Sequence, residues 1–352
     1  MKWNFVFASY RSALSALIAM VLSGCSLTHV SKNYASEILY TQFGGAANVS
    51  AWIFNVDNGE SWKIADSLWA RSWSPSGEKI LLDGDSQNKY GQVWISSSDG
   101  KKLTKVFDIN DHPDLIMFFP EKQVGPAQNT FWLTDSILLI QPEKGPIILY
   151  DIQRKQVVEV RDGAVMKSIP SKGEYWIEFR MDSYFLVYLK APHLARVLQH
   201  DFFYRYPSND GKNIAYTLVK DEVYYLAISS VDTQKGLYNE KLLSTLLSHY
   251  FGPFRWSPDN KTLLYRNYDA NSKTTKCIIL DVLEQKEVYS QPCESKTDVL
   301  MWSPRADGFL TQPNLQQYFF YRLDGSVQTL LEVPSHAGIT YQVVDWRLIE
   351  SP

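Results

Sequence analysis

The chain has 352 residues, of which 45% are hydrophobic and 14% aromatic, and its formal net charge at pH 7 is −3. This composition supports a large buried core and argues against intrinsic disorder. Because there is no excess of basic residues, nucleic-acid binding through a phosphate-neutralising face is not expected.

The first 24 residues have the pattern of an export signal. A positively charged flank precedes an apolar run over 12–22, which is too short to span a bilayer as a helix. The run ends in Leu22-Ser23-Gly24-Cys25, which resembles a bacterial lipobox. The resemblance implies a signal peptide, a lipid on Cys25 and a tether over 25–35. An ordinary secretory signal that contains a cysteine is the alternative.

The residue after the cysteine bears on the destination of the protein. In enterobacterial lipoproteins, aspartate at this position usually retains the protein at the inner membrane. Ser26 stands there instead, so the resemblance implies a bacterial envelope protein on the outer membrane, facing the periplasm.

Four segments repeat one pattern: an aromatic residue, a Ser-Pro or Pro-Ser turn, polar residues and an apolar strand. They are WSPSGEKILL (73–82), YPSNDGKNIAY (206–216), WSPDNKTLLY (256–265) and WSPRADGFL (302–310). An internal repeat determines the architecture before any single residue does. This repeat resembles the TolB-type, WD40-like propeller repeat, whose consensus is close to WSPDGKxIAF. The resemblance implies an all-β propeller fold, and such folds have many unrelated functions.

The spacing of the repeats predicts seven blades. The signature aromatics from Tyr206 onward are 44 to 50 residues apart, which suits one four-stranded blade per repeat. The region 36–352 is therefore predicted to be one seven-bladed domain, with six or eight blades as alternatives. Alternating hairpins are predicted as the outer strand pairs of successive blades, at 92–107, 148–160, 277–290 and 320–333. Segments beginning at 131 and 170 start two weaker blades.

The two ends of the domain are predicted to complete each other. Three strands over 37–65 precede the first repeat, and one strand over 341–349 follows the last blade. The last strand would supply the missing inner strand of the first blade and close the ring, which removes exposed sheet edges. Trp73, Trp256 and Trp302 are predicted to wedge between adjacent blades.

Catalytic, cofactor and metal motifs are not evident in the chain. It has no GxSxG, HExxH, GxGxxG or P-loop pattern. Its six histidines lack ligand spacing. The Asp/Asn-rich segment 108–114 lacks the glycine and the glutamate that complete a calcium loop, so a solvated turn is expected. We therefore expect no catalytic residue, cofactor or metal.

Two further cysteines lie at the ends of one predicted hairpin. Cys277 and Cys293 are each eight residues from Gln285, where the turn is predicted to centre. They would then face each other across the strands, and an oxidising compartment favours a disulfide. Two free buried cysteines are the alternative.

Long connections between blades are the predicted partner-binding sites, because long loops in compact domains are usually functional or disordered. The connection over 108–130 contains Phe118 and Phe119. The connection over 191–206 contains the run Phe202, Phe203 and Tyr204. If exposed, these aromatics form an apolar patch for a protein partner. The alternative is that they pack on the blades as local core.

The third long connection, over 237–253, is predicted to contain a helix. Leu242, Leu243, Leu246 and Leu247 follow helical spacing there. This apolar stripe has the same two interpretations, a partner surface or a local core.

The central channel is a second candidate site. Arg71, Arg205, Arg255 and Asp345 lie beside the signature aromatics and are predicted to reach the axis. Converging arginines suit an anionic ligand such as a carboxylate or a sugar phosphate. They can equally pair with neighbouring carboxylates.

Three functions remain open from the sequence. The first is a lipid-anchored scaffold that docks an envelope or periplasmic protein. The second is an immunity lipoprotein that neutralises a toxin. The third is a catalytic propeller, a lyase or glycosidase, which would need two carboxylates at the channel mouth.

Overall fold

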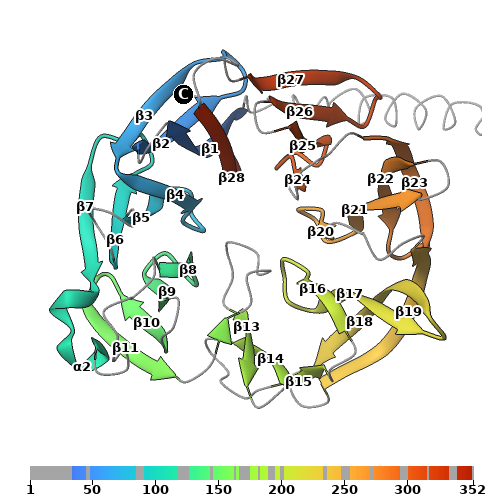
Figure 1. Cartoon of the computed structure of the whole chain (residues 1–352), viewed down its shortest axis with the longest axis horizontal. Coiled ribbons are helices and arrows are strands. Elements are labelled where there is room, and N and C mark those ends of the chain that lie inside the picture. Colours follow the sequence, from blue (N-terminus) through green and yellow to red (C-terminus); the bar gives the residue numbers. More distant parts are fainter. Residues whose placement is uncertain are drawn as a thin grey trace, which may run out of the picture. The chain divides into compact units, whose positions relative to one another are not determined.

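The described part of the chain consists of antiparallel β-sheets and two short helical turns, as seen in a computed structural model (Figure 1). It describes residues 34–44, 48–84, 91–116, 127–142, 146–161, 164–165, 175–180, 183–188, 195–198, 202–232, 236–246, 254–269, 273–293, 300–314, 317–332 and 339–350. Residues Ala35–Ile349 form one compact unit, whose architecture follows. Within these ranges no helix has the length and apolar character that a membrane span requires.

Seven four-stranded sheets, here called blades 1 to 7, occur in the described ranges. Blade 2 consists of β4 (Leu68–Trp73), β5 (Lys79–Gly84), β6 (Gln92–Ser97) and β7 (Leu103–Asp108), and blade 3 of β8 (Ala127–Trp132), β9 (Ile137–Pro142), β10 (Ile147–Asp151) and β11 (Gln156–Arg161). Blade 4 consists of β12 (Ala164–Val165), β13 (Tyr175–Arg180), β14 (Ser183–Tyr188) and β15 (Ala195–Leu198), and blade 5 of β16 (Phe202–Pro207), β17 (Asn213–Lys220), β18 (Val223–Asp232) and β19 (Gly236–Leu246). Blade 6 consists of β20 (Arg255–Trp256), β21 (Thr262–Asp269), β22 (Thr274–Asp281) and β23 (Lys286–Pro292), and blade 7 of β24 (Leu300–Trp302), β25 (Gly308–Asn314), β26 (Gln317–Arg322) and β27 (Val327–Glu332).

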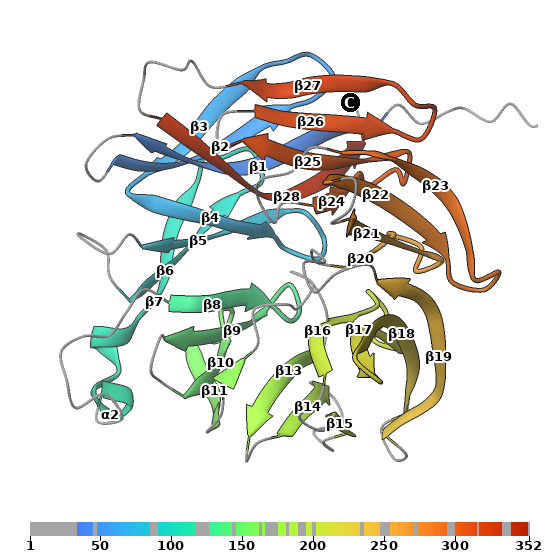
Figure 2. The same cartoon turned by 45° about the vertical axis from the view of Figure 1, so that its right-hand side comes forward.

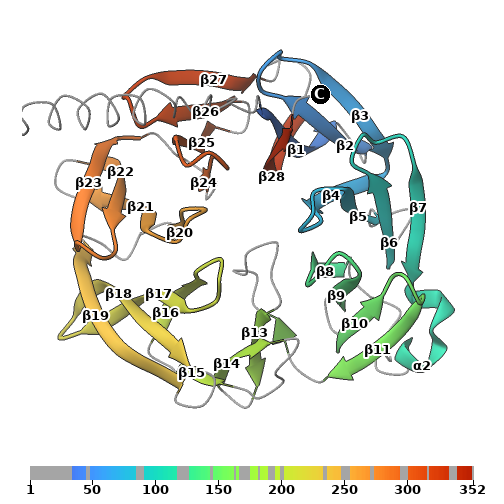
Figure 3. The same cartoon turned by 180° about the vertical axis from the view of Figure 1, so that it is seen from behind.

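Blade 1 joins the two ends of the propeller. Its strands are β28 (Ile339–Glu350), β1 (Tyr34–Gly44), β2 (Asn48–Asn55) and β3 (Ser61–Asp66), in the order β28-β1-β2-β3. The last strand of the chain thus pairs with the first, as predicted, and Figure 3 shows it from behind as the inner strand of the blade. The number of sheets agrees with the seven blades predicted from the repeat.

Two opposite faces follow from the alternating strand direction. Within a blade, the turn that joins the third strand to the fourth lies beside the turn that joins the first strand to the second. In blade 6, Val282 N–H of the former donates to the Lys261 carbonyl of the latter (3.0 Å). In blade 7, Leu323 N–H donates to the Asp307 carbonyl in the same way (2.9 Å). We call this side the Ser-Pro face, because the turns of the repeat lie on it. The second-to-third turns and the connections between blades emerge on the other side, the connection face.

The repeat has a local explanation in the turn that it forms. The Ser257 hydroxyl donates to the Asp259 carboxylate (2.6 Å) and accepts from the Thr262 amide (3.0 Å). Ser208 makes the same pair of bonds in blade 5. The serine therefore fixes the tight connection from the first strand to the second.

The signature tryptophans join neighbouring blades, as predicted. Trp256 donates its indole N–H to the Tyr206 carbonyl of blade 5 (2.8 Å), and Trp302 donates to the Arg255 carbonyl of blade 6 (3.0 Å). Trp73 is fully buried among residues of blades 1 and 2. Buried hydrophobic clusters of this kind lie between successive blades rather than inside one.

An aliphatic β-bulge recurs in the outer strand of all seven described sheets. In each third-to-fourth pairing, one aliphatic residue of the outer strand has no partner opposite it. These residues are Ile64, Val106, Val158, Val197, Leu243, Val288 and Leu330. Strand β19 has a second irregularity at Asn239 and Glu240. A bulge increases the local twist and interrupts the free edge of a sheet, which disfavours edge-to-edge association.

The predicted helix over 237–253 is wrong for the described part of that segment. Gly236–Leu246 form β19, which pairs with β18 along most of its length. Leu243 is the bulged residue, and it packs against the cluster between blades 5 and 6. Pairing and burial in a sheet therefore override the helical spacing of the leucines. Leu247 lies outside the described residues.

Cys277 and Cys293 form the predicted disulfide, with Cα atoms 5.5 Å apart. They do not face each other directly, because Cys277 pairs with Gln291 and the turn lies at 282–285. The bulge at Val288 changes the offset between the cysteines from odd to even, which places both side chains on one face of the sheet. Both are buried in the cluster between blades 6 and 7.

Candidate functional site

Two regions are candidates for function: the inner strands around the axis (Figure 1), and the connection from blade 2 to blade 3. The inner strands hold the charged residues that the sequence singled out. The connection holds the aromatic residues predicted to bind a partner.

The side chain of Arg71 forms an ion pair inside blade 2. It lies at a bulge of β4, where Ala70 pairs with Leu82 and Ser72 with Leu81. Its Nε contacts the Asp83 carboxylate at 2.6 Å. Burial raises the pKa of Asp83, and the Arg71 guanidinium opposes that shift. Arg71 therefore pairs with a neighbouring carboxylate, which was the alternative to binding an anionic ligand.

Arg255 and Asp345 form hydrogen bonds with the backbone of neighbouring blades. Arg255 Nε donates to the Leu300 carbonyl of blade 7 (3.0 Å), and its guanidinium lies 5.2 Å from the Tyr206 ring of blade 5. The Asp345 carboxylate accepts the Trp73 amide (2.9 Å) of blade 2. These side chains join blades. Arg205 lies on β16, and the structure describes its backbone but not its side chain.

Arg347 is an inter-blade residue that the sequence reasoning missed. Its guanidinium contacts the Glu37 carboxylate at 2.5 Å, and both side chains are less than a tenth exposed. It also lies 4.5 Å from the Trp73 ring and donates to the Gly77 carbonyl. One arginine thus joins the closing strand β28 to blades 1 and 2. The signal was a second charged residue in the closing strand, two positions after Asp345.

A polar residue recurs nine positions after the serine of the repeat. Asp83, Thr217, Arg266 and Gln312 occupy this position and are all buried. Gln312 Nε2 donates to the Tyr341 carbonyl of the closing strand (3.3 Å). The spacing is visible in the sequence, but its meaning depends on the register of the second strand.

Tyr318 connects blade 7 to the closing strand. Its hydroxyl donates to the Tyr341 carbonyl (2.9 Å) and accepts from the Val343 amide (3.1 Å). Burial raises the pKa of Tyr318 to about 12, whereas the Val343 hydrogen bond opposes the shift. The pKa of Tyr40 is also raised to about 12 by burial.

We expect stability to fall as the pH rises from 10 to 12. The unfolded tyrosines lose their protons near pH 10, while folded Tyr318 and Tyr40 keep theirs until about pH 12. A raised folded pKa therefore contributes stability that is full below pH 10 and is lost above it, by about 2–3 kcal/mol per tyrosine. Urea unfolding at pH 8, 10 and 11 measures the loss. Tyr318→Phe should make this dependence less steep, while Tyr40 still contributes, and an unchanged slope would contradict the assignment.

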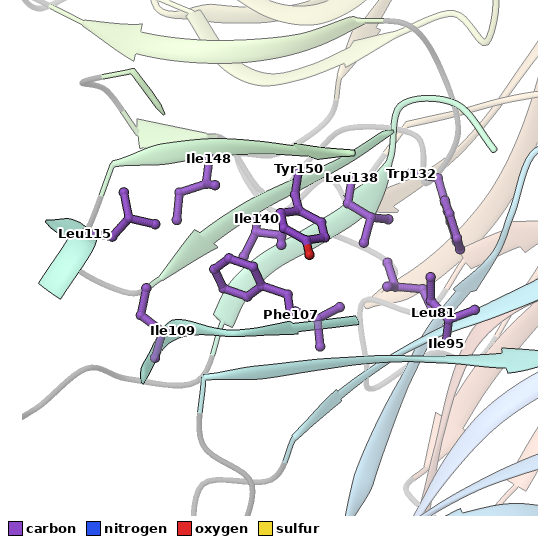
Figure 4. Packing of buried hydrophobic residues seen from close by; sticks show 11 residues of the cluster. Leu81, Ile95, Phe107, Ile109, Leu115, Trp132, Leu138, Ile140, Ile148 and Tyr150 are labelled. Carbon is purple, nitrogen blue, oxygen red and sulfur yellow. The ribbon is translucent and has the colours of Figure 1, made fainter. Parts of the chain in front are cut away.

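The connection that leaves blade 2 starts from a rigid base. It begins with η1 (Ile109–Asp111) and α2 (Pro113–Ile116), in which Ile109 and Leu115 are buried against blades 2 and 3 (Figure 4). A Cβ on Gly91 would lie 2.4 Å from Ile109, so this close approach needs glycine.

His112 adds aromatic contacts to this base. Its ring stacks on Phe107 with centroids 4.9 Å apart and meets Tyr150 edge-on at 6.3 Å. The Asp108 carboxylate accepts from Asn110 N (3.1 Å) and from Lys105 Nζ (2.9 Å). The acidic segment therefore caps a turn. In the part of the chain that the structure covers, no cluster of three or more metal-ligating side chains occurs.

The aromatic residues predicted to bind a partner fall in different places. Phe118 and Phe119 lie outside the described residues, as does Cys25. Phe202, Phe203 and Tyr204 are not in a loop: they form the start of β16, the inner strand of blade 5. Their assignment to a connection was wrong, because the strand of this repeat begins several residues before its signature aromatic.

Comparison with solved structures supports the fold alone. An oligogalacturonate lyase in complex with manganese is 12% identical, with a TM-score of 0.58, and the match covers 84% of this chain and 85% of that one. The β-propeller domain of the Trilobed protease from Pyrococcus furiosus, described as having an open velcro topology, is 12% identical, with a TM-score of 0.54 and coverage of 84% and 92%.

TolB from Acinetobacter baumannii is 15% identical, with a TM-score of 0.44, and the match covers 74% of this chain and 64% of that one. The chain thus spans less than two thirds of that protein's length. No protein-family profile and no curated protein matches the sequence. The chain is similar in fold to β-propellers, and its own architecture is a propeller closed by its last strand.

Proposed function

We propose that the protein is a lipid-anchored binding protein of the bacterial cell envelope, which docks a protein partner through the connections between its blades. The rigid base of the β7–β8 connection carries this proposal. Ile109 and Leu115 are buried and His112 is stacked, so the connection leaves the blades from a fixed point on the connection face. A preorganised base lowers the entropy cost of binding.

The bonding of the inner strands favours binding over channel chemistry. Arg71, Arg255 and Asp345 are each engaged with neighbouring strands or blades. A glycosidase or lyase would need carboxylates that are available to a substrate in a cleft. Among the described inner-strand residues, Asp345 instead accepts backbone amides. The immunity-lipoprotein alternative is a special case of the binding proposal.

The test is capture of a partner from detergent-solubilised envelope. We expect the native protein to retain a specific partner and Phe118→Ser with Phe119→Ser to lose it by more than tenfold, since interface aromatics often contribute about 2 kcal/mol or more each. A matched control is Val158→Ser with Val160→Ser, which removes two exposed apolar residues from β11. The control should capture normally.

Thermal melting separates this role from packing. Truncating a buried phenylalanine costs about 3–5 kcal/mol, whereas loss of an interface residue leaves the melting temperature nearly unchanged. A phenylalanine variant that melts much lower, or that still captures the partner, would place the interface elsewhere.

A further inference from the structure

We propose that the Ser-Pro face lies on a zwitterionic lipid surface, with Leu283 and Leu323 in contact with the bilayer, so that the connection face points away from it. This inference rests on the proposed lipid anchor at Cys25 and deepens it. It assigns each face of the propeller a role.

The chain enters the propeller on the Ser-Pro face. Ser36 N–H donates to the Asp57 carboxylate (2.7 Å), and the Ser36 carbonyl accepts from Val56 N–H (2.8 Å). Both partners belong to the third-to-fourth strand turn of blade 1, on that face. Cys25 precedes Ser36 by eleven residues, a span of at most about 40 Å when extended. An anchored Cys25 therefore keeps this face within reach of the bilayer.

A continuous path of contacts leads from the entry point to Leu323. Arg305, in the first turn of blade 7, lies 3.9 Å from the Asp57 carboxylate of blade 1. Leu323 N–H donates to the Asp307 carbonyl in that same turn of blade 7 (2.9 Å). Leu323 is 42% exposed and belongs to the blade next to the tether.

Leu283 continues the same surface onto blade 6. The Tyr289 hydroxyl of β23 donates to the Arg322 carbonyl (3.4 Å), which joins this blade to the turn that holds Leu323. Leu283, in the β22–β23 turn, is 77% exposed. Figure 2 shows the β22–β23 and β26–β27 hairpins in neighbouring blades. The two leucines are therefore turn residues of adjacent blades on one face.

The exposed residues of the corresponding turns in blades 1 to 3 are polar. In blade 1, Val56 packs partly buried and Asp57-Asn58-Gly59 are exposed, and in blade 3, Ile152 packs partly buried and Gln153-Arg154-Lys155 are exposed. Blade 2 has Ser98-Asp99-Gly100. Single exposed leucines are ordinary, but these two lie in the two blades that precede the closing strand of the tethered blade along the chain. Burying leucine in the interface of a bilayer is favourable.

The charges beside the leucines are of both signs, with Glu284 and Lys286 near Leu283 and with Arg322 and Asp324 on either side of Leu323. Because neither sign is in excess there, a zwitterionic headgroup surface fits them. The contact is weak alone, but the anchor supplies a high local concentration of lipid. Its effect is to orient the propeller rather than to hold it.

Site-specific quenching tests the orientation. With Cys25 lipidated and Cys277 bonded to Cys293, an introduced cysteine is the single free thiol. Leu283→Cys and Leu323→Cys, labelled with the fluorophore NBD, are reconstituted as full lipoprotein in phosphatidylcholine vesicles with doxyl-phosphatidylcholine as quencher. Lys220→Cys is the control, because Lys220 is exposed at the connection-face end of β17.

We expect the probes at positions 283 and 323 to be quenched at least threefold more strongly than the probe at 220. Equal quenching at the three positions would overturn the orientation, whether a protein, a second copy or water covers the leucines. Vesicle flotation tests the anchor separately, with Cys25→Ala as the unlipidated control. Native protein that fails to float would overturn the anchor itself.

Discussion

Replacing Arg347 with alanine (Arg347→Ala) is expected to lower the free energy of unfolding by about 3–5 kcal/mol, because it leaves a buried carboxylate without its partner. Glu37 is 6% exposed and receives two hydrogen bonds from the Arg347 guanidinium, at 3.0 and 2.5 Å. The change also removes the cation packed on the Trp73 ring. The contacts of the closing strand with blades 1 and 2 weaken together.

Urea unfolding followed by far-ultraviolet circular dichroism measures this effect. Arg154→Ala is the matched control, because Arg154 is 74% exposed and lies 3.8 Å from its partner Asp151. The Asp151 carboxylate keeps its bonds from the backbone amides of Gln153 and Arg154 after this change, so the loss should be at most about 1 kcal/mol. If Arg347→Ala costs no more than Arg154→Ala, the buried pair does not hold the closing strand.

Deleting residues 341–352 is expected to abolish cooperative folding. The deletion removes most of β28 and exposes the edge of β1. It removes Asp345 and therefore the hydrogen bond that its carboxylate accepts from the Trp73 amide. It also leaves the Tyr318 hydroxyl without its two backbone partners. An uncovered inner strand is a template for aggregation.

The measurement is size-exclusion chromatography with thermal unfolding of the truncated chain. We expect aggregated or protease-sensitive material. Deletion of residues 351–352 alone is the control and should fold normally. A soluble, monomeric truncation with one sharp unfolding transition would show that the first sheet does not need its last strand.

The repeat and the chain ends made the architecture predictable from the sequence. The signature aromatics fix the blade period, and the serine turn recurs with the same bonds in blades 5 and 6. The strand over 341–349 was identified because the first blade lacked an inner strand. These features are local and periodic, so they can be recognised in a sequence without knowledge of tertiary contacts.

Strand register and burial decide the parts of the fold that the sequence did not predict. Leu242, Leu243 and Leu246 follow helical spacing, yet they lie in β19, because pairing with β18 and packing against blade 6 decide the conformation there. The bulge at Val288 was invisible in the sequence, and so the cysteines were placed directly opposite each other rather than diagonally.

The candidate site was less predictable than the fold. Arg71 and Arg255 were found from their position beside the signature aromatics, but a sequence does not show which carboxylate or carbonyl an arginine will meet. Arg347 was overlooked because its partner, Glu37, is 310 positions away along the chain. Bonds across the closure depend on the ring being complete.

Amide hydrogen exchange of the closing strand tests the central claim most directly, namely that β28 completes blade 1 and joins three blades into one cooperative unit. We predict that the amides of β28 that pair with β1 exchange only with global unfolding, at the same rate as those of β5 and β21 in the middle of their blades. Fast exchange of β28, independent of urea concentration, while β5 and β21 stay protected, would contradict the closure.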